Sequence, residues 1–97
     1  MASVKELKKD IDLIMSLALS DCFYVLEYNE KVDEKAVMTI AGEIIQKHRE
    51  LRILSNHPDG KDNTKLVKQF YKKLITNMLE AVDSLLKRLS AEVKKVV

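Results

Sequence analysis

The 97-residue chain has few of the residues that interrupt helices: one proline and two glycines. Aromatic residues are also scarce, at 5%, whereas hydrophobic residues make up 46% and charged residues 33%. This balance is typical of a helical globular protein and not of a disordered chain. The single cysteine, Cys22, cannot form an internal disulfide and lies in an apolar run. We therefore expect a buried thiol and a reducing compartment.

Long uninterrupted hydrophobic runs are missing as well. The densest apolar stretch, residues 13–26, is interrupted by Ser16, Ser20 and Asp21. It is also shorter than the ~20 residues that span a bilayer. The first residues, MASVKELKKDID, alternate in charge and have no apolar core of a secretory signal. These features predict a soluble, cytoplasmic protein without membrane association.

Groups of residues with recognisable chemistry are lacking too. The sequence contains no metal-ligand cluster, no glycine-rich phosphate loop and no nucleic-acid-binding motif. Asp59, Asp62 and Asn63 offer oxygen ligands, but their spacing does not match the twelve-residue calcium loop. We therefore expect no catalytic activity, no cofactor and no metal, and the sequence argues against nucleic-acid binding.

Charge is present in quantity and unevenly distributed. The net charge is +2, made up of −4 over residues 1–46, +5 over residues 47–73 and +1 over residues 74–97. The basic block is compatible with binding to an acidic protein surface.

Three helical patterns follow one another along the chain. Ser3 and Glu6 form a capping box at the start of the first, and Asp33 is an N-cap for the second. Asp62, Asn63 or Thr64 is expected to cap the third. Apolar residues recur at spacings of three and four through all three segments. The sequence predicts helices at about residues 3–28, 33–55 and 63–95, forming one domain.

Short connections favour antiparallel neighbours, so we predict an all-α, up-down-up three-helix bundle with a long third helix and coiled-coil-like crossings. Counted from the turns, the end of the third helix extends past its neighbours by about ten residues, or ~15 Å. Together with the apolar excess of the first helix, this overhang predicts self-association, most simply as a dimer. The residues expected to mediate it are Leu17, Phe23, Tyr24, Leu89, Val93 and Val96.

Three polar residues fall on apolar stripes of these patterns. Counting from the turns places Asp21 level with Asn77. We interpret Asp21 as a structural residue that either fixes the helix register through a contact with Asn77 or faces an oligomer interface. His48 is expected at the edge of the core, with no acid at its level. Gly42 is interpreted as a notch that lets a neighbouring helix approach closely.

The stretch SNHPDGKDN, residues 55–63, separates the second and third helices and holds the only proline. Its His57-Pro58-Asp59 tripeptide follows a basic helix surface, and this arrangement resembles the signature of J-domain co-chaperones. In that family, the tripeptide and the basic face engage a heat-shock chaperone ATPase and stimulate ATP hydrolysis. The resemblance implies that Lys47, Arg49 and Arg52 form the basic face and that Phe70 is the apolar residue early in the next helix.

The same stretch also fits a plain turn. Asn56 is suited to a left-handed C-cap, and His57-Pro58-Asp59-Gly60 fits a type I turn. If this end of the bundle binds a partner, the expected contact residues are Lys47, Arg49, Arg52, His57, Asp59, Lys61, Lys65 and Lys68. The leading hypothesis is a non-enzymatic, self-associating binding protein, and the alternative is a divergent J-domain-like co-chaperone.

Overall fold

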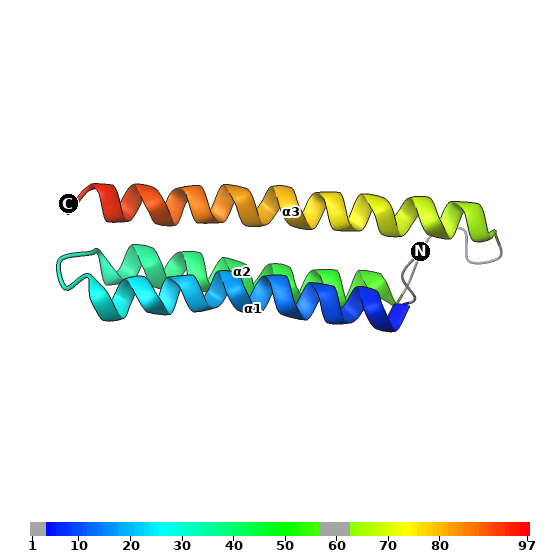
Figure 1. The fold of residues 1–97 in the computed structure, drawn as a ribbon, viewed down its shortest axis with the longest axis horizontal. Helices are drawn as coiled ribbons and strands as arrows, with labels where there is room; N and C mark the ends of the chain where they lie inside the picture. Colours follow the sequence, from blue (N-terminus) through cyan, green and yellow to red (C-terminus); the bar gives the residue numbers. More distant parts are fainter. Residues whose placement is uncertain (1–3, 57–62) are drawn as a thin grey trace.

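The computed structural model describes residues 4–56 and 63–97, and this part of the chain contains three helices and no strand. They are α1 (Val4–Tyr28), α2 (Glu34–Ser55) and α3 (Thr64–Lys94). Figure 1 shows α2 running back along α1 and α3 returning in the direction of α1. The predicted all-α, up-down-up bundle with a long third helix is confirmed. It is a rod with principal extents of 52 × 19 × 17 Å.

Side-chain caps explain where two of the helices begin. The Asp33 side chain accepts a hydrogen bond from the Ala36 N–H at 3.2 Å. The Asn63 side chain accepts from the N–H groups of Lys65 and Leu66, at 3.0 and 3.3 Å. Each satisfies backbone donors that have no partner inside the helix. The predicted Asp33 cap is confirmed, and of the three candidates for the cap of α3 the structure has Asn63. Ser3, predicted to cap α1, lies outside the described residues.

The end of α2 differs from the prediction at Asn56. Its backbone has φ −89° and ψ −11°, which is right-handed, so the predicted left-handed cap is wrong. The Asn56 side-chain amide instead donates to the Arg52 carbonyl at 3.2 Å, and its backbone N–H donates to Ile53. The final carbonyls of α2 are therefore satisfied without a left-handed residue.

The core runs the length of the rod and draws residues from every helix. Its most deeply buried members include Ile11 and Cys22 of α1, Val37 of α2 and Met78 of α3, all fully buried. The predicted buried thiol is confirmed: Cys22 is unpaired and buried. α2 and α3 are also joined by the buried Tyr71 hydroxyl, which donates to the Ser55 carbonyl at 3.3 Å.

The surplus length of α3 lies at its start and not at its end. In Figure 1 the beginning of α3 projects past the ends of α1 and α2, while its last turn is level with the α1–α2 connection. Leu89 is 5% exposed in the core of its own chain, and Val93 and Val96 pack against that core. The predicted overhang at residues 87–97 is therefore wrong. The prediction assumed that α3 starts level with the end of α2, but α3 starts farther out along the axis.

Gly42 is not a packing notch. It lies on the exposed side of α2, and a Cβ added to it would meet no atom within 4 Å. The neighbouring Ala41 makes the close contact instead, because it is 2% exposed. The prediction was based on the small size of Gly42 alone, which does not tell which side of α2 it occupies; Gly42 and Ala41 point about 100° apart.

Candidate interaction surfaces

A stripe of large apolar side chains on α1 is open to solvent. Leu13, Leu17, Tyr24 and Tyr28 are 58–64% exposed. Their spacings of four and seven residues place them on one side of the helix, next to the buried stripe. The Tyr24 and Tyr28 rings lie 4.6 Å apart between centroids. We call these four residues the α1 stripe.

A matching stripe on α3 faces the same side of the rod. Leu79 is 50% exposed, and Ile75, Val82, Leu86 and Val93 are partly buried against the core. α1 and α3 make the least extensive contact of the three helix pairs. The two stripes therefore border one long surface, which we call the α1/α3 face.

A cavity of about 290 Å³ lies between the two helices on this face. Its α1 wall is Asp21, Tyr24 and Val25, and its α3 wall is Leu86, Leu89, Ser90 and Val93. The cavity establishes which parts of α1 and α3 lie at the same level of the rod. Tyr24, which was predicted to mediate self-association, lines this cavity. Leu17, predicted for the same role, lies on the α1 stripe with Tyr24. Phe23 is also exposed, at 50%, but its position is 100° away from Tyr24.

The predicted core contact between Asp21 and Asn77 is wrong. Both residues are exposed, and Asp21 lies beside Leu86 and Ser90, more than two helical turns along α3 from Asn77. The error has the same origin as the misplaced overhang, since counting from the turn set α3 at the wrong level. Burial raises the pKa of the Cys22 thiol, and the adjacent Asp21 carboxylate raises it further.

His48 has an acidic partner that the sequence did not reveal. Its Nε2 lies 2.7 Å from Asp12 Oδ1, and Arg52 Nη1 lies 3.0 Å from Asp12 Oδ2. The prediction that His48 lies at the edge of the core holds, because it is half-buried, but the absence of an acid at its level is wrong. One α1 carboxylate thus joins two successive turns of α2. Among residues 4–56 and 63–97, no three His, Cys, Asp or Glu side chains are grouped to hold a metal.

Positive charge gathers at the end of the rod where α1 begins, α2 ends and α3 begins (Figure 1). Residues 4–13, 47–56 and 63–79, which we call the basic half, hold ten Lys and Arg against four Asp and Glu. Residues 14–46 and 80–97, the acidic half, hold six against nine. Lys5, Lys8 and Lys9 join the basic half only through the fold, so the linear charge count missed them.

The residues predicted to contact a partner at this end of the rod differ in their exposure and in whether they form ion pairs. Arg52 is paired with Asp12, and Lys47 lies 3.8 Å from Glu50 on the α3-facing flank of α2. Arg49, Lys65 and Lys68 are exposed, with no carboxylate within 4 Å in the described part of the chain. His57, Asp59 and Lys61 lie outside the described residues, as does Pro58.

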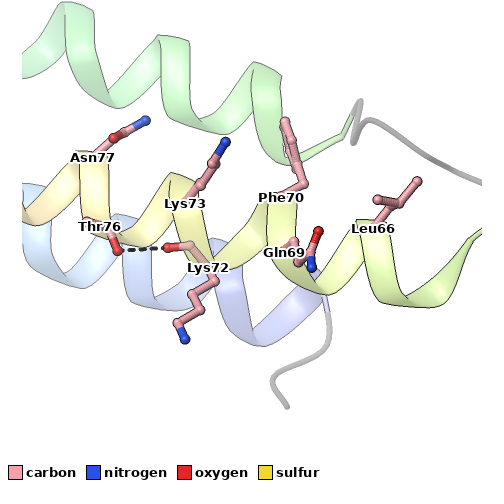
Figure 2. A pocket seen from close by; sticks show the side chains of 7 residues that line it. All are labelled: Leu66, Gln69, Phe70, Lys72, Lys73, Thr76 and Asn77. Atoms are coloured by element: carbon pink, nitrogen blue, oxygen red, sulfur yellow. Dashed lines mark hydrogen bonds between the residues drawn. The ribbon is translucent and has the colours of Figure 1, made fainter.

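A groove of about 480 Å³ runs along the first half of α3. Figure 2 shows Phe70, Lys73 and Asn77 projecting toward α2, with Lys72 on the opposite side of α3. The remaining lining residues are Leu66, Gln69 and Thr76. Because all seven belong to one helix, the groove has no second wall among the described residues. It is an open surface groove and not an enclosed pocket.

The residues predicted for self-association did not include Leu13, Tyr28 and Leu79, which are all exposed. The spacing of Leu13, Leu17, Tyr24 and Tyr28 was a usable signal, but deciding which side of a nearly all-apolar helix stays open requires the position of α3. None of the helices in residues 4–56 and 63–97 combines the length and apolar content needed to cross a bilayer. No family model, curated protein or solved structure that we compared matches this chain.

Proposed function

We propose that this chain acts by protein–protein binding without catalysis, and that it self-associates through the α1/α3 face. The observation that carries the proposal is the α1 stripe, whose four side chains are each more than half exposed. Monomeric proteins seldom leave a contiguous apolar surface of this extent open. Tyrosine is also among the residues enriched at the centres of protein interfaces.

The length of the rod supports the proposal. Because the rod is 52 Å long, a second copy lying along the α1/α3 face can contact it over many helical turns. A second copy would cover the α1 stripe and Leu79 together. A second copy that covered Phe23, which lies away from the α1/α3 face, would bury fewer exposed apolar side chains.

The test is the mass of the protein in solution with a matched pair of variants. Leu17→Glu places a charge in the α1 stripe, whereas Ile53→Glu places one at a similarly exposed apolar residue of α2, 61% against 58%. We expect light scattering after size exclusion to give a dimer for the natural sequence and for Ile53→Glu, and a monomer for Leu17→Glu. All three should keep the same helical circular dichroism. A natural chain that stays monomeric at high micromolar concentration contradicts the proposal.

A second candidate is an acidic protein partner for the basic half. It is supported by Arg49, Lys65 and Lys68, which are exposed and lie within a local excess of ten basic over four acidic residues. Such a surface accelerates association with acidic partners, and the effect weakens as salt screens it. Replacing Lys65 and Lys68 by Gln should then reduce the rate at which this chain associates with an acidic protein partner at low salt.

The co-chaperone alternative depends on a tripeptide that lies outside the described residues. α2 and α3 flank it as an antiparallel pair, as the resemblance implies. The discriminating measurement is stimulation of a heat-shock chaperone ATPase, together with its loss in His57→Gln. If the natural chain gives no stimulation, this alternative is wrong.

A further inference from the structure

We infer that two copies associate side by side and parallel, so that α1 of each copy packs against α3 of the other across the α1/α3 face. The inference rests on the proposed self-association and adds its direction and the helices that meet. It follows from the two-fold symmetry of a dimer and from the charges that lie on this face.

A two-fold axis can pair this face with its own copy in two ways. An axis across the rods gives an antiparallel pair, in which α1 lies on the partner's α1 and α3 lies on the partner's α3. An axis along the rods gives a parallel pair, in which α1 lies on the partner's α3. The direction of the dimer therefore decides which helix surfaces must complement each other.

The α1 part of the face carries two exposed acids in line with the α1 stripe. Asp10 lies three residues before Leu13, and Asp21 lies between Leu17 and Tyr24 at spacings of four and three, so all of them share one side of the helix. None of the positions in this line holds a Lys or an Arg. A contact of α1 with the partner's α1 would therefore place acids on a surface that offers them no basic residue.

The α3 part of the face begins with basic residues. Lys68 and Lys72 are exposed and lie eleven and seven residues before Leu79, which is about three and two helical turns, so they share its side of the helix. Asp83, one turn after Leu79, is paired with Lys87 at 3.0 Å. The first half of α3 thus supplies the positive charge that the acids of α1 require, which favours contact of α1 with the partner's α3.

The cavity on this face shows that the charges also lie at compatible levels. Tyr24 of α1 and Ser90 of α3 both line it, and the two helices run in the same direction. Asp10 and Thr76 lie fourteen residues before them, so these two are level as well, and Lys72 is one turn, or ~6 Å, from that level. An axis along the rods keeps every level unchanged. In a parallel pair, Asp10 and Lys72 of the two copies therefore alternate around the axis.

The like net charge of the adjoining basic halves has little effect on this arrangement. Arg49 and Arg52 belong to α2, which lies away from the α1/α3 face. Lys5 and Lys8 lie seven and four residues before Asp12, so they are on the side of α1 that contacts α2. Exposed charges farther apart than ~8 Å are largely screened at physiological salt. The contacts across the face therefore decide the direction.

The test is a charge exchange between Asp10 and Lys72, measured by the dimer dissociation constant at physiological salt. In a parallel dimer, Asp10→Lys and Lys72→Glu should each weaken association by about threefold to tenfold, because each places like charges together across the face. The double variant should return to within about threefold of the natural chain, since the contacts re-form with exchanged signs. Glu34→Lys makes the same change in net charge on α2, and as the matched control it should leave the dissociation constant unchanged.

The outcomes separate this inference from the proposed function. In an antiparallel dimer, Asp10→Lys would place a basic residue on the acidic α1 surface of the partner and tighten association. If the natural chain dimerises but Asp10→Lys does not weaken the dimer, or if the double variant does not recover, the parallel arrangement is wrong and self-association stands. If the natural chain is a monomer at high micromolar concentration, both fail. Circular dichroism checks that every variant folds, which these exposed positions favour.

Disulfide formation between two kinds of copy gives a second, independent reading of direction. Leu17 and Asp83 lie seven residues before Tyr24 and Ser90, so they are level with each other on the face. In a Cys22→Ala background, copies with Leu17→Cys are mixed with mass-tagged copies with Asp83→Cys and oxidised. A parallel dimer should give mainly the mixed disulfide, because α1 lies on the partner's α3. A predominance of disulfides between copies of the same kind would show that like helices meet, and would overturn the inference.

Discussion

At the scale of single residues, Gly42 is a position where a substitution is expected to stabilise the fold. It lies in the interior of α2, faces open space and contacts nothing that a methyl group would displace. Replacing it removes backbone freedom from the unfolded chain without a steric cost in the folded one.

We therefore expect Gly42→Ala to raise the free energy of unfolding by about 1 kcal/mol. Urea denaturation followed by circular dichroism measures the change. Ala41→Gly is the matched control and should be destabilising, since Ala41 is buried. A Gly42→Ala variant no more stable than the natural chain would mean that its surroundings are not open.

Leu89 and Leu17 are the same residue type in opposite surroundings, the core and the exposed α1 stripe. Leu89 is 5% exposed and Leu17 is 58% exposed. We expect Leu89→Ala to lower the free energy of unfolding by about 2–4 kcal/mol, as for a buried leucine whose removal leaves a cavity. Leu17→Ala should change the dissociation constant of the proposed dimer while having a small effect on the unfolding of the monomer. Equal effects on monomer unfolding would contradict the placement of Leu89 in the core.

At the scale of helices, the sequence predicted the elements well and their relative level poorly. The Asp33 and Asn63 side chains accept hydrogen bonds from backbone N–H groups two or three residues later. Such caps depend only on neighbouring residues, so the starts of α2 and α3 can be predicted from short stretches of sequence. The level of α3 depends on the path between α2 and α3, which no local pattern determines. For that reason the predicted Asp21–Asn77 contact and the predicted overhang at residues 87–97 were wrong. The missed Asp12–His48 contact joins α1 and α2 and does not depend on the level of α3.

The ion pair between α2 and α3 gives the bundle a predictable response to acid. Arg88 Nη2 lies 2.7 Å from Glu43 Oε2, and its hydrogen bond holds the pKa of Glu43 below the ordinary 4.5. A carboxylate with a lowered pKa in the folded state adds stability above its unfolded pKa and loses it as pH falls through the folded value. The contribution is modest because both side chains are about half exposed.

We accordingly expect the stability difference between the natural chain and Glu43→Gln to be constant above about pH 5 and to shrink below 4.5. Thermal denaturation across this range measures it. In an Arg88→Gln background the pH-dependent part of the difference should largely disappear. Its persistence there would show that Arg88 is not the cause.

At the scale of the whole molecule, the rod shape makes the mode of association visible in solution scattering. One copy is 52 Å long with a Cα radius of gyration of 15.7 Å. Two copies side by side keep nearly the same maximum dimension and widen the cross-section. We expect X-ray scattering from the proposed dimer to show this pattern, whereas a maximum dimension near twice that of one copy would indicate end-to-end contact.

The buried thiol of Cys22 is a natural probe for the rate at which the helices of this bundle separate. Its side chain is fully enclosed between the helices, and its raised pKa disfavours the reactive thiolate. A thiol reagent in solution therefore reaches it only when helices separate. The labelling rate, compared with that of the unfolded chain, reports how often the core is exposed under native conditions. Dimerisation that stabilises α1 against α3 would slow this rate in proportion to the fraction of chains that are paired.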